Sequence, residues 1–289
     1  MKVMYDEKND KWIQLENGSP EGYYIDGLLF KKLMLVRGMR KKGYDAIFQI
    51  VGAEGSGKST LGLLCGWVVS GEKLTINNIA ETSEDAIDKL DKLPDGSVLI
   101  IDEGSLMFSS KDTMTKEQRQ LEKILNVCRQ KGMTVIIIAP VFFSLSKYIC
   151  VHRSRFLLRV YTDSKLNRGR FAYYGEKKKK MLYILGKKNF ESYAKPKPNF
   201  RGRFVDFQVP FHEEYLKTKR RTMMAALKTN VLNPQQLKWK VESDMLWNII
   251  KSKSGITLKD IAKMTGKAYS TIKRCNKEHK ALLPRENKV

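Results

Sequence analysis

A glycine-rich stretch at residues 52–59 has the residue types that bind phosphate. Its sequence, GAEGSGKS, fits the pattern G-x-x-x-x-G-K-[ST] without departure. Glycines let the backbone curl so that successive N–H groups point at a phosphate, and the N-terminus of a following helix adds partial positive charge. We expect Lys58 to reach the β- and γ-phosphates of ATP and Ser59 to bind Mg²⁺. The predicted nucleotide-binding residues are Gly52, Ala53, Glu54, Gly55, Ser56, Gly57, Lys58, Ser59 and Thr60.

A pair of carboxylates, Asp102 and Glu103, follows the apolar stretch 98–101. A parallel strand that ends in a carboxylate delivers it to the sheet edge at which a phosphate-binding loop also lies. We expect Asp102 to hold Mg²⁺, directly or through water, and Glu103 to orient or deprotonate the attacking water. Together with Lys58, the pair predicts a Mg²⁺-dependent ATPase.

The elements that must position these residues alternate between strand and helix patterns from residue 45 onward. Predicted strands cover 45–51, 98–101, 134–139 and 155–161, and predicted helices cover 27–40, 57–70, 83–90 (with Ser83 as its N-cap), 115–131 and 212–227. A short strand at 74–77 and a hairpin of 170–174 with 181–185 complete the pattern. Apolar strands that alternate with helices predict an α/β fold with a mainly parallel sheet that is covered on both faces. Together with the phosphate-binding motif, this arrangement resembles a RecA-like P-loop NTPase core.

Charge is distributed unevenly along the chain. Residues 1–150 carry 20 basic and 20 acidic side chains, whereas residues 151–289 carry 34 and 11, so the whole net charge of +23 belongs to the second half. Such a localised excess favours a polyanionic partner, of which nucleic acid is the commonest. An anionic membrane surface is the weaker alternative, because no strongly amphipathic basic helix stands out.

Cysteine usage and hydropathy exclude several classes of protein. The four cysteines form no C-x-x-C pair and the three histidines are scattered, which argues against a zinc site and a disulfide framework. The longest apolar stretch, 61–69, is too short to cross a bilayer, and the first ten residues show no signal-peptide pattern. We expect no membrane insertion and a cytoplasmic location, in the host cytoplasm if the chain is viral.

Residues 258–274 have the spacing of a helix-turn-helix. A small residue, Ala262, stands where two helices would touch, Gly266 stands at the turn, and Ile272 would pack the second helix on the core. The second helix would present basic and polar side chains to a DNA major groove. The predicted DNA-binding residues are Lys267, Tyr269, Ser270, Lys273 and Arg274. A three-helix packing module with a basic face is the alternative interpretation.

These patterns divide the chain into four predicted regions. An N-terminal extension covers 1–44, an ATPase core 45–190 and a basic extension 191–236, and a small all-α helix-turn-helix or winged-helix domain covers 237–289.

The core resembles the P-loop ATPases in which an additional strand separates the two motifs and a catalytic glutamate follows the aspartate. The resemblance covers roughly residues 45–162 and rests on Gly52 to Ser59 and on Leu99 to Glu103. It implies ATP hydrolysis, usually coupled to mechanical work. Such ATPases commonly complete the site with an arginine from a neighbouring subunit, for which Arg153 or Arg155 is the candidate.

Within that class, the layout with a hairpin and a C-terminal reader domain is similar to FtsK/HerA-type DNA translocases, which include packaging and conjugation ATPases. The resemblance implies a homo-oligomer, a hexameric ring, that pulls duplex DNA. The strand 134–139 departs from the family because it ends Ile138-Ala139-Pro140 where a polar sensor is usual, and Ser144 or Ser146 is the candidate replacement.

Two other functions compete with a translocase. An AAA+-like replication initiator or helicase loader would also carry a DNA-binding domain, but it should have a helical lid where the sequence predicts the hairpin. A zonula-occludens-toxin-like phage assembly ATPase would share the core, but such proteins usually carry a transmembrane segment.

Overall fold

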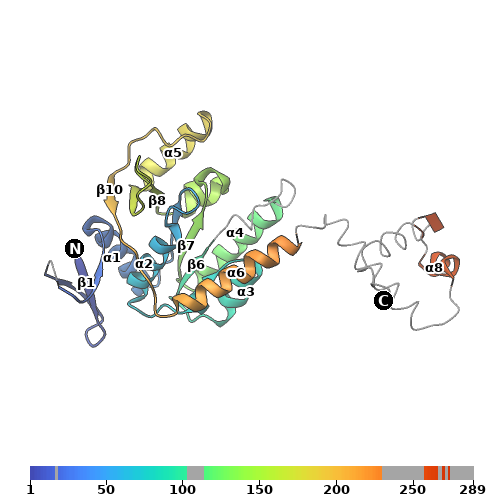
Figure 1. The fold of residues 1–289 in the computed structure, drawn as a ribbon, viewed down its shortest axis with the longest axis horizontal. Helices are drawn as coiled ribbons and strands as arrows, with labels where there is room; N and C mark the ends of the chain where they lie inside the picture. Colours follow the sequence, from blue (N-terminus) through green and yellow to red (C-terminus); the bar gives the residue numbers. More distant parts are fainter. Residues whose placement is uncertain (17–18, 103–113, 230–256, 266–268, 271–272, 274–289) are drawn as a thin grey trace, which may run out of the picture. The chain divides into compact units, whose positions relative to one another are not determined.

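The computed structural model describes residues 1–16, 19–102, 114–229, 257–265, 269–270 and 273 (Figure 1). The chain forms two compact units, Met1–Arg220 and Arg221–Val289. The first unit is a mixed α/β structure around a mostly parallel sheet, as the sequence predicts.

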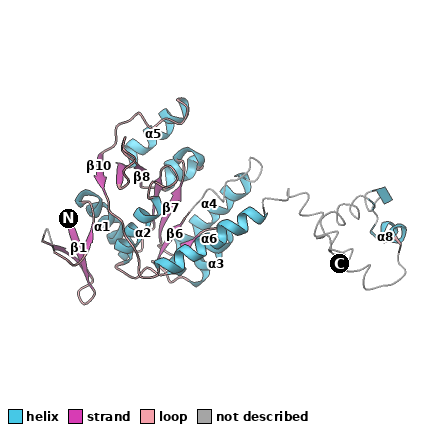
Figure 2. Cartoon of the chain, in the orientation of Figure 1, coloured by secondary structure: helices cyan, strands magenta, loops and turns pink. Residues whose placement is uncertain are grey.

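The central sheet has seven strands in the order β10-β9-β8-β4-β7-β6-β5 (Figure 2). Strand β4 is parallel to β7 and β8, and β6 is parallel to β7 and β5, whereas β9 is antiparallel to both β8 and β10. Strand β7 therefore lies between β4 and β6. The bounds are β4 Ala46–Val51, β5 Ile79–Ala80, β6 Val98–Ile101, β7 Thr134–Ala139, β8 Phe156–Tyr161, β9 Arg170–Tyr174 and β10 Phe200–Arg203.

Helices cover both faces of the sheet, which explains why its parallel strands are continuous apolar runs. Phe48 and Ile50 of β4 share a core with α1 and α2, whereas Ile47 and Val51 share the opposite core with α3, α4 and α5. The bounds are α1 Gly27–Lys41, α2 Lys58–Ser70, α3 Ser83–Lys92, α4 Met114–Gln130 and α5 Glu176–Lys188, with 3-10 turns at Ile76–Asn78 and Phe142–Ser144 and a π-helix at Tyr148–Arg153.

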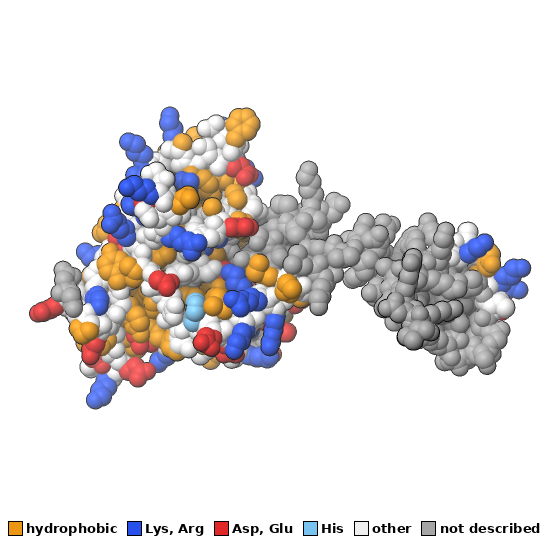
Figure 3. All heavy atoms as spheres, viewed as in Figure 1, with side chains coloured by type: hydrophobic (Ala, Val, Ile, Leu, Met, Phe, Trp, Pro, Cys, Tyr) orange, Lys and Arg blue, Asp and Glu red, His pale blue; other side chains and the backbone are white. Residues whose placement is uncertain are grey.

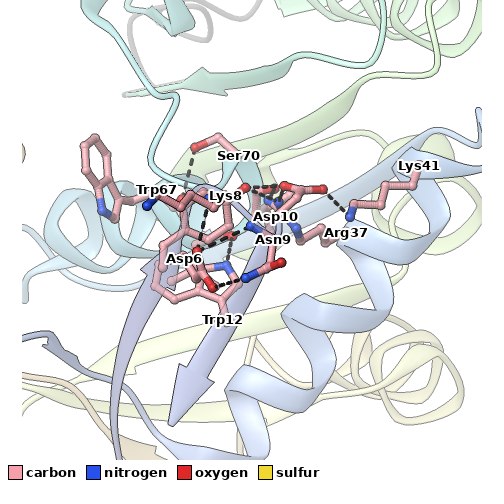
Figure 4. A network of polar contacts seen from close by, with 12 residues as sticks. Asp6, Lys8, Asn9, Asp10, Trp12, Arg37, Lys41, Trp67 and Ser70 are labelled. Carbon is pink, nitrogen blue, oxygen red and sulfur yellow. Dashed lines mark hydrogen bonds and ion pairs between the residues drawn. The ribbon is translucent and has the colours of Figure 1, made fainter. Parts of the chain in front are cut away.

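A small antiparallel sheet precedes α1, within the predicted N-terminal extension. It consists of β1 (Lys2–Asp6), β2 (Lys11–Leu15) and β3 (Tyr23–Tyr24). Polar contacts connect it to α1 and α2 (Figure 4): the buried guanidinium of Arg37 donates to the carbonyl of Val69 at 3.0 Å and forms an ion pair with Asp10. The indole of Trp12 donates to the carbonyl of Val68 at 3.0 Å. These contacts hold the N-terminal sheet against the C-terminal end of α2.

The predicted hairpin of 170–174 with 181–185 is wrong in its second half, because residues 181–185 lie within α5. The antiparallel neighbours of β9 are β8 and β10 instead. Glutamate, lysine and leucine favour a helix, and an ion pair of 2.7 Å between Glu176 and Lys180 joins its first turn. Only one side of α5 is buried, and Lys179 and Leu182 lie on that side.

Two smaller predictions also differ from the structure. Residues 74–77 are not a strand; the short strand is β5, just after the 3-10 turn. The N-cap of α3 is Thr82, whose hydroxyl accepts from the backbone N–H of Asp85 at 3.1 Å, so Ser83 is the first helical residue.

Helix α6 (His212–Thr229) carries the chain from the first unit into the second. In the second unit, α8 (Leu258–Thr265) begins with a capping box in which Thr257 and Asp260 exchange hydrogen bonds. Among the helices that the structure describes, none has a stretch of the length and hydropathy needed to span a bilayer.

Candidate nucleotide-binding site

The phosphate-binding loop, residues 52–59, connects the end of β4 to the start of α2. Gly52 is in close contact with β8, because a Cβ there would lie 2.3 Å from the carbonyl oxygen of Val160. Gly57 is the N-cap of α2 and has a φ of 97°, in the left-handed region that favours glycine. The two glycines therefore allow a backbone conformation of the loop that a larger residue at either position would prevent or strain.

The polar groups of the loop are suited to an anion. Gly57 provides no side-chain cap, so the first N–H groups of α2 have no acceptor from that residue. The hydroxyl of Ser56 is buried and has no hydrogen-bond partner within the described part of the chain. The ammonium of Lys58 donates to the carbonyl of Ala53 at 2.9 Å, across the loop. A phosphate group in the loop would supply acceptors for these donors.

Asp102 follows β6 at the same sheet edge and is connected to the loop. Its carboxylate is 1% exposed, and the hydroxyl of Ser59 donates to its Oδ1 at 3.2 Å. A hydroxyl and a carboxylate are the hard oxygen ligands that suit Mg²⁺. The two residues predicted to hold the metal are therefore adjacent, and their chemistry fits it.

Two residues of α6 that the sequence analysis did not select complete this cluster. The hydroxyl of Tyr215 donates to Oδ2 of Asp102. The ammonium of Lys219, one turn later, lies 3.0 Å from the same oxygen and 3.2 Å from the hydroxyl of Ser59. Burial, and secondly the charge of Asp102, raise the pKa of Tyr215, so its phenol stays protonated and acts as a donor. The i, i+4 spacing of these residues in a basic helix was visible in the sequence, but their partner was not.

Three further side chains lie close to the loop or to Asp102. The guanidinium of Arg168, in the connection from β8 to β9, is 3.8 Å from the position that a Cβ of Gly55 would take. The ring of Phe204 packs against Gly57, where a Cβ would lie 3.2 Å from its Cζ. Glu81 is 5% exposed and follows β5 as Asp102 follows β6, so the two residues lie at the same level of the sheet edge.

The two predicted arginine fingers lie at the opposite edge of the sheet. Arg153 and Arg155 precede β8, whereas the phosphate-binding loop follows the parallel neighbour β4. The guanidinium of Arg153 donates to Asp45 at 2.9 Å and to the carbonyl of Leu125 at 3.0 Å. Arg155 is exposed. Neither arginine can therefore reach the loop of its own chain, and a catalytic role for either one remains a prediction that requires a second subunit.

The remaining predicted residues divide between described and undescribed parts of the chain. Tyr269, Ser270 and Lys273 are helical and exposed, and their contact with DNA stays a prediction. Glu103, Lys267 and Arg274 lie outside the described residues. The two candidate sensors form local hydrogen bonds: Ser144 donates to the carbonyl of Val141 at 2.7 Å, and Ser146 donates to Glu122 at 3.1 Å.

Comparisons with known proteins show limited likeness. No protein-family model and no curated protein sequence matches the chain. Among solved structures, it is similar to the genome packaging NTPase B204 of Sulfolobus turreted icosahedral virus 2 in complex with AMP, at 18% identity and a TM-score of 0.34, over 47% of this chain and 94% of that one.

Two structures of a replication initiator are similar over more of the chain. DnaA from Aquifex aeolicus bound to AMPPCP has 14% identity and a TM-score of 0.33, over 90% of this chain and 87% of that one. The replication initiator DnaA bound to AMPPCP and single-stranded DNA has 13% identity and a TM-score of 0.32, over 87% of each chain. All three TM-scores are below 0.5, so the likeness of the chain to these structures is weak.

Proposed function

We propose that the chain is a Mg²⁺-dependent ATPase that works on DNA, as a translocase or packaging ATPase of the FtsK/HerA type. The observation that carries the ATPase assignment is the hydrogen bond between Ser59 and Asp102, because it joins the phosphate-binding loop to the acidic end of β6. The position of β7 between β4 and β6 supports the additional-strand class.

In this proposal each residue of the site has a separate role. The loop N–H groups and Lys58 bind the phosphates, and Ser59 and Asp102 hold Mg²⁺. The metal would neutralise charge on the β- and γ-phosphates. Glu103 acts as the base that positions the attacking water. An arginine of a neighbouring subunit, Arg153 or Arg155, stabilises the charge of the transition state, which makes a homo-oligomeric ring part of the proposal.

DNA as the partner is supported by charge and by the C-terminal unit. The basic excess lies in residues 151–289, and Figure 3 shows Lys and Arg side chains gathered over α6. The described residues of the predicted reading helix, Tyr269, Ser270 and Lys273, are exposed. We propose that residues 237–289 bind duplex DNA through the phosphates and groove edges.

One observation favours the replication initiator or helicase loader as a second candidate. Residues 176–188 are helical rather than the second strand of a hairpin, so one argument against a helical lid no longer holds. In addition, α6 lies between the core and the predicted DNA-binding domain and presents Lys219 to the magnesium ligands. The loader hypothesis expects a sensor arginine on a helical element between the core and the reader domain, and α6 has a lysine at the contact.

The first experiment is ATP hydrolysis by the purified chain without DNA, with single-stranded DNA and with duplex DNA. The control is Lys58→Ala, which should lose nucleotide binding. Strong stimulation by duplex DNA is expected for a translocase, whereas preference for single-stranded DNA would favour the initiator or loader. Hydrolysis that is indifferent to DNA would contradict a motor that acts on DNA.

DNA affinity is tested separately, at matched salt concentration. Lys273→Ala should weaken binding to all duplex sequences and lower the slope of log affinity against log salt by about one. The control is Lys8→Ala, which removes an exposed charge from the N-terminal unit. If the two variants change DNA affinity equally, the predicted helix does not contact DNA.

A further inference from the structure

Helix α6 places a positive charge where the two magnesium ligands meet. The ammonium of Lys219 lies 3.0 Å from Oδ2 of Asp102 and 3.2 Å from the hydroxyl of Ser59. These are the two groups that hold the metal in the proposed function. Lys219 therefore contacts both ligands of the site at hydrogen-bond distance.

The neighbouring Tyr215 fixes the helix in this position. Its ring is 2% exposed and belongs to the core cluster that α2 and β4 share, and its hydroxyl donates to the same carboxylate. The ammonium of Lys219 is 3.4 Å from that hydroxyl. One turn of α6 thus supplies two donors to Asp102.

A lysine ammonium and Mg²⁺ compete for such a site, for two reasons. Both need the lone pairs of the same carboxylate and hydroxyl oxygens. Both are cations, and their mutual repulsion is strong in a site that excludes most water. The contact of Lys219 with Asp102 and the binding of Mg²⁺ therefore oppose each other.

We propose that Lys219 is an internal counter-cation of the magnesium site, which neutralises Asp102 between nucleotides and leaves it when Mg²⁺ and nucleotide bind. This inference rests on the proposed function and adds a regulatory step to it. Departure of Lys219 frees the turn of α6 around residue 219, immediately before the unit that begins at Arg221. Binding of nucleotide thereby changes the stability of the α6 segment that leads to the predicted DNA-binding domain.

The first test uses the wild-type chain and hydrogen–deuterium exchange. With Mg²⁺ and a non-hydrolysable ATP analogue, the amides of α6 around residues 216–222 should exchange about tenfold faster, which corresponds to the loss of one charge-assisted hydrogen bond. The same analogue without Mg²⁺ should leave them protected. Unchanged exchange in a protein that demonstrably binds the Mg²⁺–nucleotide complex would overturn the inference.

The second test uses Lys219→Met, with Lys217→Met as the matched control. Lys217 is exposed on the same helix, so the control removes the same charge away from Asp102. Lys219→Met should lower by about tenfold the Mg²⁺ concentration that half-saturates analogue binding, and its α6 amides should already exchange fast without Mg²⁺. The control should match the wild type in both measurements.

The opposite result has a specific meaning. If Lys219→Met weakens binding of the Mg²⁺–analogue complex, Lys219 is a phosphate ligand and the counter-cation role is overturned. Tyr215→Phe keeps the ring in the core and removes only one donor, so it should shift the Mg²⁺ requirement in the same direction by a smaller factor. If the wild type binds no nucleotide at all, the proposed function fails and this inference fails with it, whereas binding with no response of α6 refutes this inference alone.

Discussion

Substitution of Gly57 by alanine should weaken nucleotide binding far more than the loss of a single contact. Gly57 is the N-cap of α2 and has a φ of 97°. A non-glycine residue in the left-handed region costs about 1–2 kcal/mol, and this φ lies beyond the centre of that region. The new Cβ would also be 3.2 Å from Cζ and 3.3 Å from Cε2 of Phe204, which is buried and cannot move freely.

The combined strain is about 2–3 kcal/mol, and the loop can relieve it only by leaving the conformation that directs its N–H groups at phosphate. Nucleotide must then restore that conformation on binding, so the dissociation constant should rise by about 30- to 150-fold. Equilibrium titration with a fluorescent ATP analogue measures this directly. Chemical denaturation should show that the free energy of unfolding falls by no more than the same amount.

Gly55→Ala is the control, because it separates backbone strain from the contact with Phe204. Gly55 also has a positive φ, 69°, but a Cβ there would meet only Arg168, at 3.8 Å. Its effect should therefore stay near fivefold, from the backbone cost of about 1 kcal/mol. Equal or weaker binding by Gly55→Ala relative to Gly57→Ala would refute the role given to Phe204. Affinity within twofold of the wild type for both variants would refute the loop conformation itself.

Four other substitutions have defined outcomes. Glu103→Gln should retain nucleotide affinity and lower single-turnover hydrolysis by about 100-fold or more, and normal turnover would exclude Glu103 as the base. Burial lowers the pKa of Lys179 to about 8 in the folded chain, so the unfolded chain binds more protons above that pH. Between pH 8 and pH 10.5, the unfolding free energy of the wild type relative to Lys179→Met should therefore rise by up to about 3 kcal/mol. If Arg155 acts in a neighbouring subunit, mixing the Arg155→Ala and Lys58→Ala proteins should restore part of the ATPase activity that each lacks alone. Arg153→Ala should instead lower the unfolding free energy by about 2–3 kcal/mol, because the carboxylate of Asp45 is left unpaired.

The parts of the fold that local sequence patterns determine agree with the structure. Strands 98–101 and 134–139 have the predicted bounds, because buried parallel strands are uninterrupted apolar runs bounded by turn residues. The phosphate-binding loop between β4 and α2 is also predictable from the sequence, because each glycine and the Lys58–Ser59 pair are needed for the local geometry of the loop. Asp102 could be placed at the correct edge from the strand that precedes it.

The apolar run at 181–185 shows where such patterns mislead. Its apolar residues fit neither the period of a helix nor that of a half-buried strand. The helix that forms buries Leu182, whereas Met181, Ile184 and Leu185 stay at least two-fifths exposed. A run of this kind indicates a buried strand when it is judged by hydropathy alone. The lysines and glutamate that precede it favour a helix, and the tertiary contacts of Lys179 and Leu182 fix which side faces the core.

The contact between α6 and the proposed magnesium ligands could not be predicted from the sequence, because it is a product of chain topology. Tyr215 and Lys219 are 113 and 117 residues from Asp102 in sequence. In the sequence they are one aromatic and one basic residue of a lysine-rich helix, and a solvated face explains such a pattern as well as a site does. Only the path from β10 back to the carboxyl edge of the sheet brings α6 to Asp102.

That topology has a physical rationale in the chemistry of the site. A buried carboxylate such as that of Asp102 is costly without a positive partner, and in the proposed function the metal leaves with the product. A chain that supplies its own cation avoids an uncompensated charge during that interval. Because Lys219 is carried on a helix that continues into the second unit, its proposed release from Asp102 would make the position of that helix depend on nucleotide. Stability of the empty site and communication with the C-terminal unit are then consequences of one ion pair, and a single substitution at Lys219 should alter both together.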